Sequence, residues 1–177
     1  GRLKILRFEG HYHGWFDNEF WNYAPPLDRA GPRESPLPVP MSAGQPASDG
    51  EHLVIRPWND LALVADAFAR HPGEIAAVLT EPILCNTGGI PPKPGYLEGL
   101  RELCTNHGAL LIFDEVITGF RVSLGGAQEL FGVTPDLATF AKGMAGGFPV
   151  SALAGRREWM RAFGDMSVTH SGTYNSN

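Results

Sequence analysis

Two residues of the sequence combine chemical reactivity with an unusual position. Asp114 ends the apolar run in ALLIFDEV, and Lys142 ends the next apolar run, before the glycine-rich turn in TFAKGMAGGFP. A carboxylate beside a buried run is costly unless a cation or a hydrogen-bond donor meets it. A lysine next to glycines leaves room for a ligand to approach its amine, which can act as a nucleophile or a base. An isolated pair of this kind more often forms a structural ion pair, so both interpretations stay open at this point.

Other polar residues occupy comparable positions near strand ends. Glu81 and Glu115 are either active-site carboxylates or capping and ion-paired groups, and the sequence favours neither. His11 and His13 have the spacing of a metal-binding pair, but no third ligand follows at a suitable spacing. The glycines after Lys142 lack the order of a nucleotide phosphate loop, and no GxGxxG follows an early strand. A metal site and a nucleotide site are therefore disfavoured.

Short apolar runs bounded by glycine and proline predict the strands that must hold these residues. We expect strands within residues 3–9, 75–82, 109–116, 136–141 and 151–155. Together with the helical segments between them, they predict an α/β fold with a mostly parallel sheet flanked by helices. Ligands of such sheets bind beyond the carboxyl ends of the strands, where the polar residues above are expected.

Helical spacing and a proline-rich stretch define the segments between the strands. A helix is expected after a cap at Asn59, with an apolar face of Leu61, Val64, Ala65 and Phe68. Further helices are expected at Tyr96–Asn106, 126–132 and 157–163. Residues 24–46 contain too many prolines for a helix and show no strand alternation, so we expect a long loop. Such a loop is expected to border the active-site entrance, where it could gate access, or else to be disordered.

Composition indicates a folded protein without affinity for nucleic acid or membrane. The 177 residues are 43% hydrophobic and 19% charged, and the net charge of −5 comes without a long basic run. No apolar stretch approaches the roughly 18 residues of a membrane span, and no secretory signal opens the chain, so a cytoplasmic location is expected. Cys85 and Cys104 are expected to be buried thiols. The chain opens on an apolar strand and stops in a polar loop, so we expect it to be a fragment.

Five motifs in order give the sequence a specific family resemblance. YHG at 12–14, EP at 81–82, FDEVITGFR at 113–121, AKGMAGGFP at 141–149 and SGTYNSN at 171–177 resemble the series of the class III pyridoxal-phosphate-dependent aminotransferases. The central run is especially similar to the glutamate-1-semialdehyde aminomutases and their transaminase relatives. The resemblance implies that residues 1–177 form part of the large domain of a fold type I dimer. The family's upstream phosphate loop and small domain would lie outside this sequence.

The resemblance also implies roles for individual residues around pyridoxal 5'-phosphate. Lys142 would form the Schiff base with the cofactor and move the substrate proton, and Asp114 would keep the pyridine nitrogen protonated. Tyr12 would stack on the ring with His13 beside it, and Val116 would press on the opposite face.

Further residues are implied at the edges of the same site. Glu81 and Asn86 are expected near the cofactor and substrate, and Thr173 would bind the cofactor phosphate of the other subunit. Cys85 stands where relatives commonly have glycine, which alters the wall near the substrate.

The expected reaction is amino-group transfer between small molecules. We expect a transaminase that uses an amino acid or amine as donor and a carbonyl compound as acceptor. A glutamate-1-semialdehyde aminomutase, which returns the amino group to the same molecule, is the close alternative. A non-catalytic truncated scaffold is the alternative from a different class.

Overall fold

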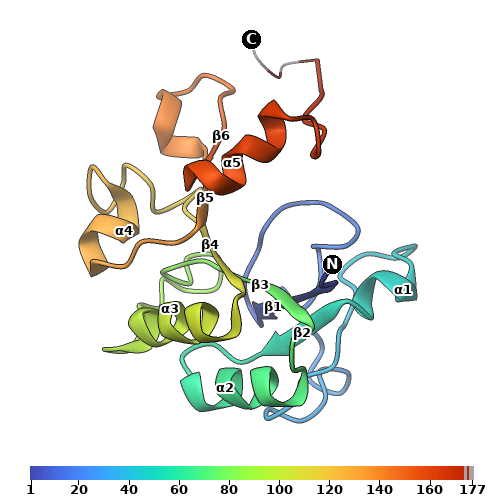
Figure 1. Cartoon of the computed structure of the whole chain (residues 1–177). Coiled ribbons are helices and arrows are strands. Elements are labelled where there is room, and N and C mark those ends of the chain that lie inside the picture. Colours follow the sequence, from blue (N-terminus) through green and yellow to red (C-terminus); the bar gives the residue numbers. More distant parts are fainter. Residues whose placement is uncertain (174, 176–177) are drawn as a thin grey trace.

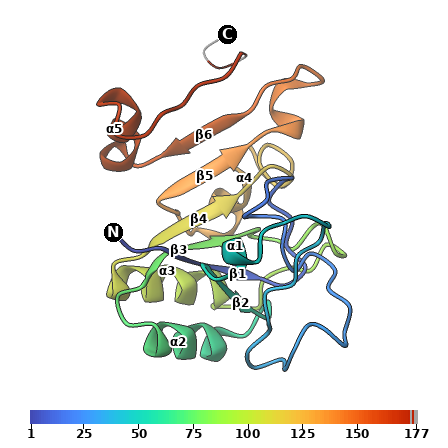
Figure 2. The same ribbon diagram turned by 90° about the vertical axis from the view of Figure 1, so that its right-hand side faces the viewer.

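A six-stranded β-sheet forms the centre of the computed structural model, which describes residues 1–173 and 175. The strands lie in the order β2-β1-β3-β4-β5-β6, and Figure 2 shows β2 at one end of the sheet and β6 at the other. Neighbours from β2 to β5 pair in parallel, whereas β6 pairs antiparallel with β5. The strands are Lys4–Phe8 (β1), Leu53–Arg56 (β2), Ile75–Thr80 (β3), Leu110–Asp114 (β4), Leu137–Phe140 (β5) and Ala152–Gly155 (β6).

The described chain also contains five α-helices and one short 3-10 helix, all between strands except α5, which follows β6. They are Ala47–Gly50 (α1), Leu61–Arg70 (α2), Tyr96–His107 (α3), Gly126–Phe131 (α4), Lys142–Ala145 (η1, the 3-10 helix) and Arg157–Gly164 (α5). Figure 1 shows α2 and α3 side by side against the sheet, in agreement with their mutual contacts. Within the described part of the chain, no helix has the length and apolar character that crossing a membrane requires.

The two faces of the β1–β2 end of the sheet are covered by different parts of the chain. Leu6, Phe8 and Val54 belong to the main core with the buried side chains of α2 and α3. Ile5 and Ile55, which alternate with them along the strands, pack instead around Trp21 from the loop after β1. The loop therefore takes the place of a helix on the second face.

Residues 24–46 form the irregular segment that the prolines predict. An isolated bridge joins Trp21 to Pro40, and the buried Asn22 binds the carbonyl of Leu37 and the amide of Val39 through its side chain. These contacts fold the segment back on its own start. The segment is therefore held by the bridge and by the hydrogen bonds of the Asn22 side chain, and not by regular secondary structure.

The structure confirms the predicted fold class and corrects three local expectations. The strand β2 was not expected from the sequence, because a run of four buried residues is too short to give a clear pattern. The cap of α2 is Asp60, whose carboxylate accepts the Leu63 amide at 3.3 Å, and not Asn59. Ala67, and not Ala65, is buried on the apolar face of this helix.

Asn59, which was predicted to cap α2, makes other contacts. Asn59 adopts a left-handed backbone conformation with φ of 64°. Its side chain binds the Pro91 carbonyl and the Lys93 amide, at 3.0 and 2.8 Å. It therefore ties the start of α2 to the loop that leads into α3.

Candidate active site

The carboxyl ends of the parallel strands meet at a cavity of about 290 Å³. The loops after β1, β3 and β4 and the segment after β5 each contribute to its wall, as expected for an open α/β sheet. All of the residues predicted for the site except Thr173 line it: Tyr12, His13, Glu81, Asn86, Asp114, Val116 and Lys142. The structure therefore brings together side chains that lie up to 130 positions apart in the sequence.

Asp114 is held in the cavity by three hydrogen bonds. Its Oδ2 lies 2.8 Å from Nδ1 of His13, whose side chain is only 3% exposed. Its Oδ1 accepts the Val116 amide at 3.0 Å and the Thr139 hydroxyl at 3.4 Å. These donors meet the desolvation cost that the sequence predicted for this carboxylate, and they fix its orientation.

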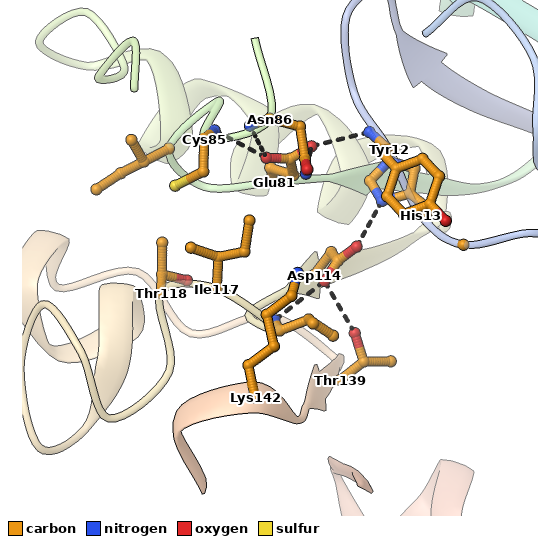
Figure 3. A pocket seen from close by; sticks show the side chains of 13 residues that line it. Tyr12, His13, Glu81, Cys85, Asn86, Asp114, Ile117, Thr118, Thr139 and Lys142 are labelled. Carbon is orange, nitrogen blue, oxygen red and sulfur yellow. Dashed lines mark hydrogen bonds and ion pairs between the residues drawn. The ribbon is translucent and has the colours of Figure 1, made fainter. Parts of the chain in front are cut away.

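Lys142 approaches the same cavity from η1 without pairing with Asp114. Figure 3 shows its side chain extending toward Asp114, yet the two form no ion pair within 4.0 Å, and the carboxylate is hydrogen-bonded to His13 instead. The structural Asp–Lys ion pair is therefore not the arrangement found here. Among the residues that the structure describes, no carboxylate pairs with this amine, which faces the cavity.

The backbone at Lys142 adopts a conformation that is uncommon for a residue with a side chain. Its φ is 45°, in the left-handed region, at the first position of η1. Such conformations cost free energy and persist where the surrounding structure imposes them, which is common at functional sites. The observation supports a functional role for the lysine.

Glu81 connects the two loops that form one side of the cavity. Its buried carboxylate accepts the Tyr12 amide at 2.9 Å from the loop after β1. It also accepts the Cys85 amide at 2.8 Å, and the amide and side-chain NH₂ of Asn86 at 3.3 and 2.9 Å, from the loop after β3 (Figure 3). A carboxylate with this many donors orients the loops that carry its neighbours.

Glu115 has the capping role that the sequence left open for it. Its buried carboxylate accepts the amides of Ala127 and Gln128 at the start of α4, at 2.7 and 3.2 Å, and the Thr118 hydroxyl at 2.8 Å. It does not line the cavity formed by the described residues. Glu81 and Glu115 thus have different roles despite similar positions at strand ends.

The rest of the cavity wall includes residues that the sequence did not predict for the site. Cys85 lines the cavity as expected, and burial raises the pKa of its thiol, to which the charge of Glu81 adds. The wall also contains residues that were not predicted for the site: Gly14, Ile83, Ile117, Thr118 and Thr139. Thr139 pairs in register with Asp114 on the adjacent strand, a relation that only the strand order discloses. Thr173 is exposed and lies outside the cavity wall.

Neither the loop expected at the entrance nor the C-terminal motif expected to reach another subunit contributes to this cavity within the described residues. Within the described chain, no residue of 24–46 lines this cavity, so the predicted border position of that loop finds no support. The motif at 171–177 lies partly outside the described residues, because residues 174 and 176–177 are not among them.

The buried imidazole of His11 gives the protein a predictable response to acid. Its side chain is fully buried and its Nδ1 accepts the Glu81 amide at 3.0 Å. Burial, with smaller contributions from His13 and Arg7, holds the pKa of His11 well below its ordinary value of 6.5. As the pH falls below about 6.5, the His11 imidazole binds a proton in the unfolded chain but stays neutral in the folded chain. The free energy of unfolding should therefore decrease, by up to about 1.4 kcal/mol per pH unit.

Denaturant unfolding at several pH values tests this prediction. The matched variant is His11→Asn, because its Oδ1 can still accept the Glu81 amide. We expect the variant to lose less stability on acidification than the original protein. Burial also raises the pKa of Glu9, which acts in the opposite direction but is present in both proteins. Equal pH slopes in the two proteins would contradict the assignment to His11.

Comparison with known proteins gives one consistent result. The chain matches the family model for aminotransferase class-III over residues 1–177. It is 49% identical over 178 aligned positions to the glutamate-1-semialdehyde 2,1-aminomutase of Nitratidesulfovibrio vulgaris (strain DP4), which covers 100% of this chain and 40% of that protein. The family resemblance expected from the motifs is therefore confirmed.

Solved structures agree with the sequence comparison. A crystal structure of an omega-transaminase from Sphaerobacter thermophilus has a TM-score of 0.91 at 36% identity, covering 99% of this chain and 41% of that one. A transaminase with PLP bound has a TM-score of 0.86 at 34% identity, covering 99% of this chain and 40% of that one. The chain thus spans about 40% of the length of the relatives it matches.

Proposed function

The chain belongs to the class III aminotransferase family, and on this basis we propose that the whole protein is a transaminase acting on an amino acid or amine and a carbonyl acceptor. Pyridoxal 5'-phosphate is the cofactor that the family and the PLP-bound relative support. The observation that carries the proposal is the cavity that Asp114 and Lys142 share without pairing to each other.

The described residues fit this cofactor in their chemistry. A pyridinium nitrogen needs an anionic partner, and Asp114 is a carboxylate that faces the cavity. An aldehyde needs an amine, and Lys142 contributes one to the same space. Tyr12 and Val116 supply an aromatic and an aliphatic surface for a flat ring. When bound, the cofactor supplies an electron sink that stabilises negative charge on the carbon beside the transferred amine.

Each residue then has a defined task in the proposed reaction. Lys142 would hold the cofactor covalently through Nζ until the amine of the substrate displaces it, and the freed Nζ would then take the proton from the substrate carbon and return it. Asp114 would keep the ring nitrogen protonated, with His13 and Thr139 fixing the orientation of its carboxylate. Tyr12 would stack on the ring, and Glu81 and Asn86 would shape the wall beside it.

A glutamate-1-semialdehyde aminomutase is the second candidate. The 49% identity to the Nitratidesulfovibrio vulgaris enzyme over the whole chain favours it. The residues named above serve both reactions, because the two differ in whether the intermediate carbonyl compound leaves before it is re-aminated. The site residues therefore support amino-group transfer without separating the two.

An absorption experiment on the whole protein tests the proposal and separates the candidates. Added pyridoxal phosphate should give a visible band from lysine-bound cofactor, and a suitable amino donor should bleach it. A transaminase should release a keto acid or aldehyde in amounts equal to the bleached cofactor. An aminomutase should convert glutamate-1-semialdehyde without an added acceptor. A protein that gives no band would instead match the non-catalytic scaffold.

The domain and subunit arrangement are also proposals. We propose that residues 1–177 belong to the cofactor-binding large domain, and that the whole protein is a homodimer in which Thr173 reaches the cofactor of the partner. Thr173 is exposed, as are the apolar side chains of Phe148 and Trp159 near β6 and α5, which supports a covering subunit. Sedimentation of the whole protein tests the dimer. The cytoplasmic location stays a prediction.

A further inference from the structure

Arg7 is a buried cation that the proposed chemistry does not use. It lies within β1, is 1% exposed, and does not line the cavity of the described residues. Burial lowers the pKa of its guanidinium, while the charges of Glu19 and Glu81 act in the opposite direction. A buried guanidinium is costly unless it is well paired, so its contacts indicate what it does.

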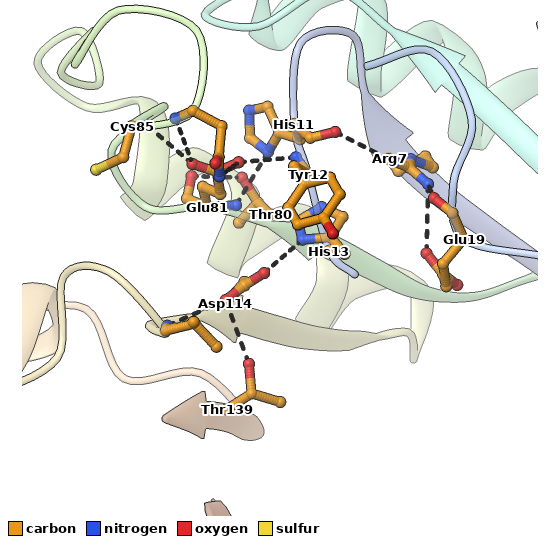
Figure 4. Close-up of polar contacts among 12 residues, drawn as sticks. Arg7, His11, Tyr12, His13, Glu19, Thr80, Glu81, Cys85, Asp114 and Thr139 are labelled. Carbon is orange, nitrogen blue, oxygen red and sulfur yellow. Dashed lines mark hydrogen bonds and ion pairs between the residues drawn. The ribbon is translucent and has the colours of Figure 1, made fainter. Parts of the chain in front are cut away.

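The contacts of Arg7 reach both ends of the loop that carries Tyr12 and His13. Its Nη2 donates to the backbone carbonyl of His11 at 3.1 Å. Its Nη1 donates to the backbone carbonyl of Glu19 and lies 3.4 Å from the carboxylate of the same residue. Figure 4 shows the guanidinium between these two attachment points. The guanidinium of Arg7 therefore links the two ends of the segment 11–19.

The peptide unit between His11 and Tyr12 is held on both of its polar groups. Arg7 donates to its carbonyl, and Glu81 accepts from its N–H at 2.9 Å. The Glu81 amide in turn donates to the imidazole of His11 at 3.0 Å. Because both polar groups of one peptide are bound by buried charged side chains, the peptide plane has a single orientation. That orientation sets the position of Tyr12.

We propose that Arg7 is a positioning residue for the cofactor, which fixes the His11–Tyr12 peptide so that Tyr12 and His13 are preset to receive the pyridine ring. The inference rests on the proposed function, since the ligand is pyridoxal phosphate. Preset groups bind more tightly because less conformational freedom is lost on binding. Without Arg7, the loop has to be ordered by the cofactor itself.

Arg56 provides a matched control on the neighbouring strand. It is also buried, at 4% exposure, and it lies in β2 opposite Phe8 of β1. Its guanidinium donates to the carbonyls of Ile55 and Leu63 and lies 3.9 Å from the carboxylate of Asp66. It forms no hydrogen bond or ion pair with residues 11–19, all of which the structure describes. An arginine that acts only on stability should behave like Arg56.

The test compares Arg7→Met with Arg56→Met in the whole protein. We expect both variants to unfold at lower temperature. The Kd for pyridoxal phosphate should rise about tenfold or more in Arg7→Met and stay within about twofold in Arg56→Met. In the cofactor-free proteins, amide hydrogen exchange across residues 11–19 should accelerate only in Arg7→Met.

Two results would overturn the inference or its premise separately. Equal cofactor affinities in the two methionine variants would show that Arg7 acts on stability alone. Failure of the original protein to bind pyridoxal phosphate would instead contradict the proposed function. Should Arg7→Met fail to fold, Arg7→Lys replaces it, with Arg56→Lys as its control. Lysine keeps the charge but lacks the planar fork that reaches two acceptors, so the same difference in Kd is expected.

Discussion

Replacing Lys142 with alanine should lower kcat/KM for amino transfer by about 10⁴-fold or more, because one side chain supplies both the covalent anchor and the proton carrier. The exposed position of Lys142 at the start of η1 means that its removal leaves no buried void. The variant should therefore fold as the original protein does. The loss of kcat/KM is measured in activity assays with the amino donor that bleaches the cofactor band of the original protein.

Lys93→Ala is the matched control for this experiment. Lys93 is also exposed, and its amide, not its amine, makes the contact with Asn59. We expect its activity and its cofactor spectrum to match those of the original protein. Lys142→Ala should still take up some cofactor but should lose the band of the lysine-bound form. Retained turnover together with that band would remove Lys142 from the mechanism.

The sequence predicted most of the residues that gather at the cavity because strand ends and family motifs coincide there. Asp114 and Lys142 follow apolar runs long enough to be recognised as strands, and the parallel arrangement brings their carboxyl ends to one edge. The same reasoning pointed to Glu81, whereas Val116 was expected from the family resemblance alone. Position at a strand end brought these residues into consideration, because the carboxyl ends of parallel strands lie at one edge, and the family motifs then separated a functional role from a structural one.

The contacts that orient these residues could not be read from the sequence. The bond between His13 and Asp114 joins positions about one hundred residues apart, and it depends on the order in which β1, β3 and β4 lie in the sheet. Thr139 reaches Asp114 because of the register between β4 and β5. Strand order and register arise from the packing of the whole sheet, and local pattern does not encode them.

The two neighbouring carboxylates illustrate the same limit. Glu81 and Glu115 both follow apolar strands, yet Glu81 lines the cavity and Glu115 caps α4. The difference arises from the chain beyond each residue. After Glu115 the backbone returns to present the free amides of a helix start, which attract a carboxylate. After Glu81 it forms the loop whose amides, with that of Tyr12, surround the carboxylate on the cavity side.

Asp114→Asn should reduce kcat by about 10²–10³-fold, the loss observed when one preorganised electrostatic partner is removed from an active site. Asparagine has nearly the same shape and can keep a hydrogen bond to the Val116 amide, so the cavity should remain intact. What it lacks is the negative charge that would keep the ring nitrogen protonated. The electron sink is then weaker, and abstraction of the substrate proton becomes slower. KM should change less than kcat, because the charge matters most when negative charge develops on the substrate carbon.

Asp136→Asn separates this effect from the general cost of losing a buried carboxylate. Asp136 is 3% exposed, binds the Leu111 amide at 2.7 Å, and pairs with Arg101 and Arg156 outside the cavity. Its variant should lose stability, because two arginines lose their partner, while each folded and cofactor-loaded molecule keeps its turnover. Asp114→Asn should show the reverse, with modest loss of stability and large loss of turnover. Equal turnover losses in the two variants would mean that Asp114 acts through the fold and not through the cofactor.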